Sequence, residues 1–258
     1  MLGKQIRLKR ITKKGKAVII PMDHGTTEGP IPGLENMEKM VKKIEKGKAT
    51  AILVHKGILQ NLNHVPNCGV ILHLSASTKL GQDPEHKVLV ASVQEAIHLG
   101  ADAVSIHVNI GGNIHENSML ESLGKISKDC LENQIPLLAM MYPRGKNIAK
   151  IDPETISHIA RIGGELGADL VKTVYTGNEK SFKKIVDSCP VPIVIAGGPK
   201  CSTDQEVLEM VKGAMNAGAI GVSLGRNAFQ HKNPVAMVRA IREIVVKNAE
   251  VKDALELM

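Results

Sequence analysis

Residues 170–176 read Leu-Val-Lys-Thr-Val-Tyr-Thr, an apolar, β-branched run typical of a buried strand, with a lysine near its centre. A lysine is unusual there, because without water its ammonium must pair, lose its proton or serve in chemistry. A neutral lysine attacks carbonyl carbon and can form a Schiff base. Alternatively, the stem of Lys172 lies along the sheet while its head reaches solvent or a carboxylate. This stretch alone leaves both possibilities open.

Seven further short β-branched runs are spaced along the chain, and between most of them apolar residues recur at helical spacing. Continuous apolar strands that alternate with helices indicate a parallel sheet covered by helices, and eight units can close a barrel. We therefore predict a single (β/α)8 TIM barrel domain over residues 1–258. A doubly wound open sheet is the alternative, but no Gly-x-Gly-x-x-Gly follows the first strand. The seven runs begin at Ala17, Ala51, Val70, Ala103, Pro136, Pro192 and Ile220.

Similar turns support this repeat. Leu-Gly-Ala-Asp or Ala-Gly-Ala sequences contain Gly100, Gly167 and Gly218, where a left-handed glycine would end a helix shortly before the next strand. A looser version occurs at residues 46–49. The spacing between the second and third strands is short, so a stub of helix is expected there. The clearest helical segments are 37–45, 92–99, 155–166 and 204–217.

The composition narrows the class of function. The 258 residues include no stretch near the roughly 18 apolar residues that cross a bilayer, so no membrane partner is expected. A net charge of +7 is compatible with nucleic acid, but 2% aromatic residues and no Trp do not make a stacking platform, which favours anionic small molecules. Four cysteines without a CxxC pair predict reduced thiols in the cytoplasm.

Chemistry in such a barrel lies at the carboxyl ends of the strands. Glycines follow the last two strands, at Gly197-Gly198 and at Gly225, where backbone N–H groups could approach a phosphate. Arg226 could add charge-assisted hydrogen bonds. Tight turns alone would also explain these glycines, but their place after strands seven and eight favours phosphate.

Two other strand ends could complete a site for carbonyl chemistry. Asp23 follows the first strand and Tyr142 ends the fifth, so with Lys172 they would provide a charge stabiliser, a proton shuttle and a nucleophile. Arg144 or Lys56 could be the cationic neighbour that activates the lysine. Taken singly, Asp23 could merely begin a turn and Tyr142 could merely pack its ring.

Two competing functions remain at this point. Histidines end four successive strands and could converge on a divalent metal with Asp23, although no HxH or HExxH spacing is present. A non-catalytic barrel that binds phosphate as a regulator is the other alternative, but it would have no use for Lys172 as a nucleophile. The four histidines are His24, His55, His73 and His107.

Five motifs together resemble those of the archaeal-type class I aldolases, and the similarity runs in order over nearly the entire chain. This family uses a lysine Schiff base and requires no metal or other cofactor. Its substrates are phosphorylated keto-sugars and small aldehydes, and its members form ring-based decamers, so the resemblance implies a homo-oligomer. The motifs are PMDHG at 21–25, MYPRG at 141–145, LVKT at 170–173, AGGP at 196–199 and VSLGRN at 222–227.

The resemblance also implies a role for each matching position. Lys172 would form the Schiff base, Asp23 would accept a proton and Tyr142 would donate one. The family's transaldolases cleave 6-deoxy-5-ketofructose 1-phosphate and transfer a three-carbon enamine to L-aspartate semialdehyde, whereas its other branch acts on fructose 1,6-bisphosphate. Met140 and Met141, where that branch tends to have an aromatic residue, favour a transaldolase. The bound sugar phosphate would be bordered by His24, Pro143 and Arg144, with Gly197, Gly198, Gly225 and Arg226 around its phosphate.

Overall fold

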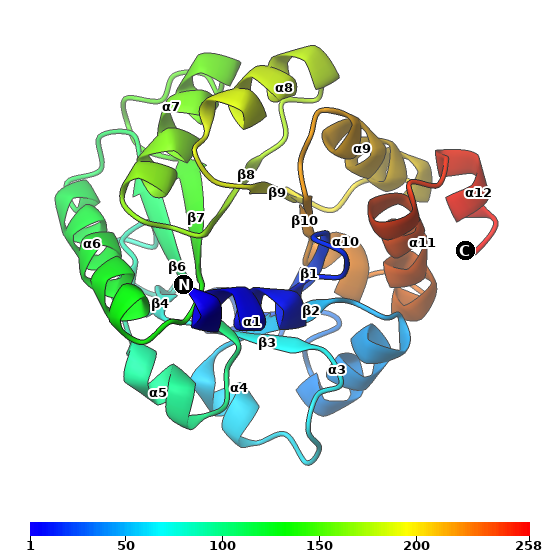
Figure 1. The fold of residues 1–258 in the computed structure, drawn as a ribbon, viewed down its shortest axis with the longest axis horizontal. Coiled ribbons are helices and arrows are strands. Elements are labelled where there is room, and N and C mark those ends of the chain that lie inside the picture. Colours follow the sequence, from blue (N-terminus) through cyan, green and yellow to red (C-terminus); the bar gives the residue numbers. More distant parts are fainter.

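Eight parallel strands close into a barrel in the computed structural model, which describes residues 1–258 (Figure 1). The strand order around the barrel is β1-β10-β9-β8-β7-β6-β3-β2, so neighbours in sequence are neighbours in space. Each predicted β-branched run contributes one strand, and the predicted TIM barrel is confirmed. The strands are β1 (Ala17–Pro21), β2 (Ala51–Val54), β3 (Gly69–His73), β6 (Ala103–Ile110), β7 (Leu137–Pro143), β8 (Leu170–Val174), β9 (Ile193–Ala196) and β10 (Gly221–Ser223).

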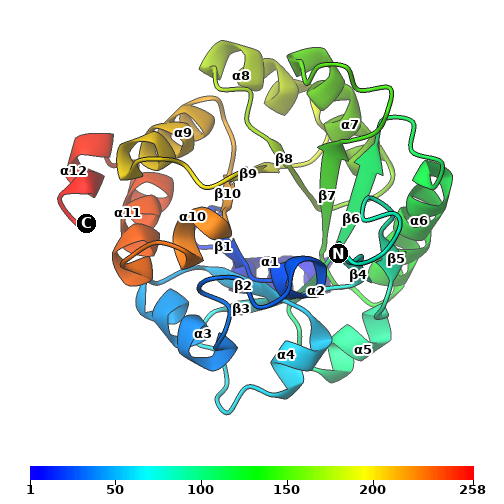
Figure 2. The ribbon, with the colours of Figure 1, turned by 180° about the vertical axis from the view of Figure 1, so that it is seen from behind.

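Helices form a ring outside the strands (Figures 1 and 2). The four helical segments predicted from periodicity are present as α3, α5, α7 and α9, and the expected stub between the second and third strands is α4. None of the helices is long and apolar enough to cross a membrane. The ring contains α3 (Met37–Lys46), α4 (Lys56–Gln60), α5 (Val93–His98), α6 (Glu116–Glu132), α7 (Pro153–Glu165), α8 (Glu179–Ser188), α9 (Asp204–Asn216), α11 (Pro234–Lys247) and α12 (Val251–Leu255).

The core has two layers, as expected for strands that are buried on both faces. A cluster of 55 buried apolar residues fills the space between strands and helices, and a smaller cluster of 11 fills the barrel interior. Ile19 and Leu53 belong to the interior cluster, whereas their neighbours Ile20 and Ile52 face the helices. This alternation fixes which side chains of each strand can point toward the barrel axis.

The helix-ending turns behave largely as expected. Gly100, Gly167 and Gly218 have φ values of +77°, +96° and +100°, the left-handed conformation that lets a helix stop. The looser turn differs, because Gly47 has an ordinary φ of −72° and the left-handed residue is Lys48, at +63°. The chain therefore turns one residue later at that helix.

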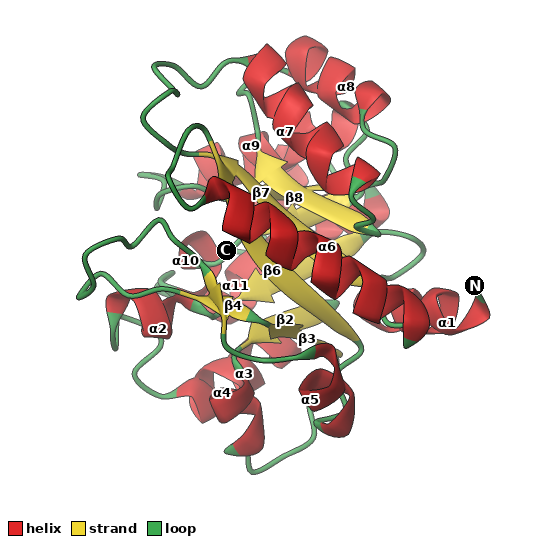
Figure 3. Cartoon of the chain, turned by 90° about the vertical axis from the view of Figure 1, so that its left-hand side faces the viewer, coloured by secondary structure: helices red, strands yellow, loops and turns green.

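An N-terminal helix, α1 (Leu2–Ile11), was not predicted. It lies across one end of the barrel, opposite α2 (His24–Glu28) and α10 (Arg226–Phe229), as Figure 3 shows. Ile11 is fully buried in the interior cluster, and Lys4 donates to Asp169 over 2.7 Å. Asp169 also accepts from the backbone N–H of Leu137, so one carboxylate joins α1 to the start of β7. The basic N-terminal segment thus closes the amino-terminal end of the barrel.

Candidate active site

A pocket of about 370 Å³ opens at the carboxyl ends of the barrel strands. This volume lies within the range of pockets that bind small molecules. Figure 2 shows this end of the barrel, with α2 and α10 beside the strands. All ten residues that were predicted to form the site line this pocket. They are Asp23, His24, Tyr142, Pro143, Arg144, Lys172, Gly197, Gly198, Gly225 and Arg226.

Lys172 stands in the middle of β8, where its Cα pairs with Met140 on β7 and with Val194 on β9. The residue is only 6% exposed, and what remains exposed lines the pocket. Thr173 and Val174 show the alternation of the strand, because Val174 lines the pocket with Lys172 while Thr173 is fully buried and does not. The lysine is therefore directed into the site and shielded from bulk water.

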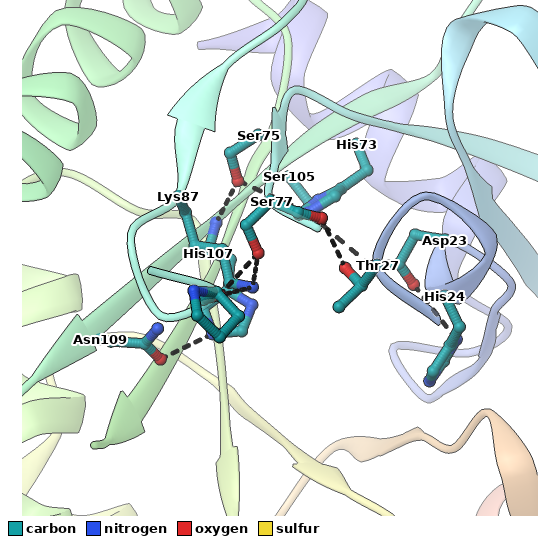
Figure 4. A network of polar contacts seen from close by, with 11 residues as sticks. Asp23, His24, Thr27, His73, Ser75, Ser77, Lys87, Ser105, His107 and Asn109 are labelled. Atoms are coloured by element: carbon teal, nitrogen blue, oxygen red, sulfur yellow. Dashed lines mark hydrogen bonds and ion pairs between the residues drawn. The ribbon is translucent and has the colours of Figure 1, made fainter. Parts of the chain in front are cut away.

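Asp23 lies between β1 and α2 and is flanked by two imidazoles. Its carboxylate oxygens are 3.7 Å from His73 Nε2 and 3.7 Å from His24 Nδ1 (Figure 4). Burial by itself would raise the pKa of this carboxyl, but His73, His24 and Lys172 together hold it below its usual range. Asp23 is thus a carboxylate at neutral pH, placed to pair with positive charge at Lys172, including that of an iminium.

The histidines are divided between two places in the pocket wall. His73 contacts His55, with ring centroids 5.2 Å apart, and its Nδ1 lies 2.8 Å from Ser105 Oγ. His107 instead packs at 4.9 Å against the ring of Tyr142, and its Nε2 lies 2.8 Å from Asn109 Oδ1 (Figure 4). No three histidine, cysteine or acidic side chains gather in a group that could hold a metal ion. The alternative in which several strand-end histidines converge on a metal with Asp23 is therefore not the observed arrangement.

Burial keeps these imidazoles neutral. It lowers the pKa of His73 to about 3 and lowers the pKa of His107 well below its usual value. The unfolded chain would take up these protons near pH 6.5, before the folded protein does. The contribution to stability is thus present above about pH 6.5 and is lost as the pH falls toward about 3.

We expect the free energy of unfolding to fall with pH below about 6.5, by up to about 1.4 kcal/mol per pH unit for each buried neutral histidine. Urea unfolding near pH 7.5 and near pH 5 would measure it, and His73→Gln should reduce the difference. His158→Gln is the matched control, because His158 is exposed on α7. A His73→Gln protein with the pH dependence of the unaltered chain would contradict the assignment.

Tyr142 and Arg144 form the side of the pocket at the end of β7. The guanidinium carbon of Arg144 lies 5.0 Å from the centroid of the Tyr142 ring, within cation–π range. Arg144 Nη1 is also 3.6 Å from Glu85 Oε2. The phenol therefore has an imidazole, from His107, and a guanidinium beside its ring.

The opposite side of the pocket is built from backbone. The Arg226 Nη2 group donates to the carbonyl of Gly198, and Asn227 Nδ2 donates to the carbonyl of Gly197. A Cβ at Gly225 would come within 2.7 Å of the His24 ring and 2.9 Å of the Pro21 carbonyl oxygen, so no larger residue fits without movement. This side offers glycine backbone and one guanidinium to an anion.

Two polar residues near strand ends do not line this pocket. Tyr175 is on the opposite face of β8 from Lys172, and its ring packs at 5.1 Å against Phe182 of α8. Lys56 begins α4 and pairs with Glu95 at 2.6 Å, so it is not the cationic neighbour of Lys172.

The main residue that was not predicted is Lys87, which is 8% exposed and lines the pocket. It precedes β5 (Val88–Leu89), which pairs with β4 (Ser75–Ala76) in a small antiparallel sheet after β3. The Lys87 ammonium donates to the Pro84 carbonyl over 2.9 Å and to Ser77 Oγ (Figure 4). The only feature of the sequence that could have pointed to Lys87 is its position immediately before the apolar pair Val88–Leu89.

Comparison with known proteins gives concordant results. Residues 17–231 match the model of the DeoC/LacD family aldolases. The 2-amino-3,7-dideoxy-D-threo-hept-6-ulosonate synthase 1 of Archaeoglobus fulgidus is 45% identical over 258 residues, which cover 99% of this chain and 96% of that protein. The corresponding synthase of Halobacterium salinarum is 40% identical, over 98% of this chain and 95% of that protein. A solved archaeal fructose-1,6-bisphosphate aldolase, with its catalytic lysine bound to the carbinolamine intermediate of the substrate, has a TM-score of 0.88 and 32% identity, over 94% of this chain and 99% of that one.

Proposed function

We propose, because the chain belongs to the DeoC/LacD family of aldolases, that it is a Schiff-base transaldolase that makes 2-amino-3,7-dideoxy-D-threo-hept-6-ulosonate. The observation that carries this proposal is the burial of Lys172 in one pocket with Asp23, Tyr142 and the glycines after the last two strands. The donor would be 6-deoxy-5-ketofructose 1-phosphate and the acceptor L-aspartate semialdehyde, on a route to 3-dehydroquinate and aromatic amino acids.

The proposed reaction begins when the neutral amine of Lys172 adds to a ketone carbon of the donor. Loss of water from the resulting carbinolamine gives an iminium. The iminium withdraws electrons from the neighbouring carbon–carbon bond, so cleavage releases an aldehyde fragment and leaves a neutral enamine on Lys172. The enamine carbon then attacks the acceptor aldehyde, and water hydrolyses the new iminium to free the product and the lysine. No carbanion has to be stabilised at any step.

The other residues would provide charge and protons. The carboxylate of Asp23 would pair with the iminium and accept a proton, and the phenol of Tyr142 would donate one. Gly197, Gly198 and Gly225 would offer backbone N–H groups to the donor phosphate, with Arg226 beside them.

His24, Pro143 and Arg144, which also line the pocket, would border the sugar. They stand on two sides of it, because His24 follows β1 while Pro143 and Arg144 come at the end of β7. Their contribution would be position and shape, with no bond made to the reacting carbon.

The experiment that tests the covalent mechanism is borohydride reduction with the donor present in EDTA, followed by peptide mass analysis. Borohydride reduces the iminium to a stable secondary amine, so the peptide with Lys172 should gain the mass of the reduced sugar fragment. Activity lost to EDTA without any adduct would instead point to a metal-dependent reaction.

A fructose-1,6-bisphosphate aldolase is the second candidate, because such an enzyme shares the fold with a TM-score of 0.88. Met140, which lines the pocket beside Lys172, favours the transaldolase, because the resemblance gives the fructose-bisphosphate branch an aromatic residue near this position. Cleavage rates for the two donors would separate the candidates.

We also propose that the enzyme works in the cytoplasm as a homo-oligomer. All four cysteines are free, in keeping with a reducing compartment. Met1, Leu2 and Ile6 of the α1 region are 55–71% exposed, an apolar surface that a second subunit could cover. Sedimentation equilibrium would measure the oligomer, and a monomer at micromolar concentration would contradict this proposal.

A further inference from the structure

His107 lies in the same row of the barrel wall as Lys172. The Cα of His107 pairs with that of Met140 on β7, and the Cα of Met140 pairs with that of Lys172 on β8. All three residues line the pocket. Neighbouring strands are about 4.8 Å apart, so the Cα atoms of His107 and Lys172 are separated by two strand spacings, about 10 Å. His107 therefore faces the space that a small group bound to Lys172 would occupy.

A chain of hydrogen bonds decides which ring nitrogen of His107 carries the hydrogen. Asn109 Nδ2 donates to the Glu85 carbonyl over 2.7 Å, and because a carbonyl only accepts, this contact fixes the orientation of the Asn109 amide. Asn109 Oδ1 then lies 2.8 Å from His107 Nε2 (Figure 4). An amide oxygen also only accepts, so the hydrogen is on Nε2. Asn109 is fully buried, and no solvent competes for these bonds.

The other ring nitrogen, Nδ1, is left as a hydrogen-bond acceptor. Burial lowers the pKa of His107 well below its usual value, so the ring is neutral and has a single N–H. Nδ1 makes no hydrogen bond with the protein, and it is not one of the buried polar atoms that lack a partner. Its lone pair is thus open to the pocket, where it can accept from an O–H group of a bound molecule.

The imidazole is also held in place. Its ring packs against Tyr142, with centroids 4.9 Å apart, and the backbone N–H of His107 donates to Ser75 Oγ over 3.0 Å. With the bond to Asn109, three contacts fix the ring before any substrate arrives. A fixed acceptor binds a hydroxyl without the entropy loss of ordering a mobile side chain.

The proposed product shows which hydroxyl would meet this acceptor. In 2-amino-3,7-dideoxy-D-threo-hept-6-ulosonate, carbon 7 is a methyl group, carbon 6 a ketone, and carbon 5 bears a hydroxyl. The three transferred carbons are therefore a methyl ketone with one adjacent hydroxyl, which is the hydroxyl on carbon 4 of the donor, and the phosphate leaves with the other fragment. While this unit is bound to Lys172, the hydroxyl is its only polar group besides the nitrogen.

We infer that His107 binds the transferred unit, with Nδ1 accepting a hydrogen bond from the hydroxyl that this unit carries next to the carbon bound to Lys172. The inference rests on the proposed transaldolase function and assigns a residue to recognition of the three-carbon fragment itself. No proton is transferred in this contact. Lys172 and His107 together hold the fragment at two points while the phosphorylated aldehyde leaves and the acceptor enters.

The test compares the donor with an analogue that lacks only this hydroxyl, 4,6-dideoxy-5-ketofructose 1-phosphate. The analogue keeps the hydroxyl on carbon 3, whose oxygen becomes that of the released aldehyde, so its carbon–carbon bond can still be cleaved. We expect the unaltered enzyme to prefer the donor by about 10- to 100-fold in kcat/KM for release of the phosphorylated aldehyde, the range for one buried hydrogen bond.

The variants should change this preference selectively. His107→Phe keeps a ring against Tyr142 but has no nitrogen, so the rate with the donor should fall by about 10- to 100-fold and the rate with the analogue much less. His107→Gln can still donate to Asn109 and present an oxygen to the pocket, so it should retain most of the preference. His158→Gln, at an exposed histidine on α7, is the control and should change neither rate.

Two results would overturn the inference: equal cleavage of both compounds by the unaltered enzyme, or an equal loss with both in His107→Phe, which would mean that the ring only supports Tyr142. Borohydride trapping on Lys172 with the donor tests the proposed function separately. Absence of the adduct in the unaltered enzyme would overturn that function, whereas an adduct without any donor preference would overturn the inference alone. If His107→Phe does not fold, His107→Met, which also lacks a ring nitrogen, takes its place.

Discussion

Lys172→Arg is expected to lose turnover by a factor on the order of 10⁴ or more while the barrel remains folded. Arginine keeps a positive charge and a similar length, so it can occupy the same interior position between Met140 and Val194. Its guanidinium stays protonated at any accessible pH and cannot add to a ketone. The substitution therefore removes the nucleophile while it preserves most of the charge near Asp23.

Three measurements distinguish this loss from damage to the fold. The thermal unfolding midpoint should change little, the borohydride adduct should disappear, and phosphate-containing ligands should still bind. Lys183→Arg is the matched control, because Lys183 is exposed on α8 and pairs only with Asp187. Near-normal turnover by Lys172→Arg would rule out a Schiff base at this lysine.

The strands could be predicted because each one can be recognised from its own short stretch of sequence. A parallel barrel buries both faces of each strand, so each one is a continuous β-branched run, and eight such runs stand out from the intervening helical periodicity. The helix ends could also be predicted from short stretches of sequence, since a glycine, which adopts the left-handed conformation easily, often marks the end of a helix. Thr203 shows the same for a helix start, because it forms a capping box with Glu206, only three residues further along the chain.

Those site residues that lie on barrel strands or directly after them could be predicted from the sequence. Asp23, Tyr142 and Lys172 follow or occupy strands whose carboxyl ends must meet, and they do line one pocket. The two-residue period of the strand also accounts for the position of Tyr175. Counting from Lys172 by twos reaches Val174 inside and leaves Tyr175 outside, where it packs on α8.

Other features depend on contacts between distant residues and could not be read locally. Lys87 enters the pocket because β5 pairs with β4 and because Asn109 holds the intervening segment. The N-terminal helix is fixed by an ion pair between residues 4 and 169, which a basic sequence does not reveal. The positions of Lys87 and of the N-terminal helix depend on how the barrel closes and how its loops pack, so the periodicity of the sequence cannot predict them.

Asp23→Asn is expected to lower kcat by about 10²- to 10⁴-fold, the range for loss of a positioned general base. Asparagine has nearly the same shape and can still accept a hydrogen bond, so the pocket wall should survive. It has no negative charge, and the iminium on Lys172 would lose its nearest carboxylate. The variant also cannot take up the proton that the enamine step requires.

The pKa of Asp23 sharpens this prediction. Because His73, His24 and Lys172 hold this pKa below its usual range despite burial, the carboxylate remains charged at neutral and mildly acidic pH. The acid side of the pH–rate profile should therefore not follow Asp23 near its usual value of about 3.9. In Asp23→Asn the rate should fall by a similar factor at every pH, with the shape of the profile retained.

Trapping and steady-state rates together locate the lost step. If Asp23 acts after the Schiff base forms, borohydride should still label Lys172 in Asp23→Asn while cleavage of the donor is slow. Asp187→Asn, at an exposed carboxylate on α8, controls for the loss of one negative charge. An unchanged rate of cleavage in Asp23→Asn would mean that another residue is the general base. His24 would be the first candidate, since its buried Nδ1 has no hydrogen-bond partner and lies 3.7 Å from Asp23.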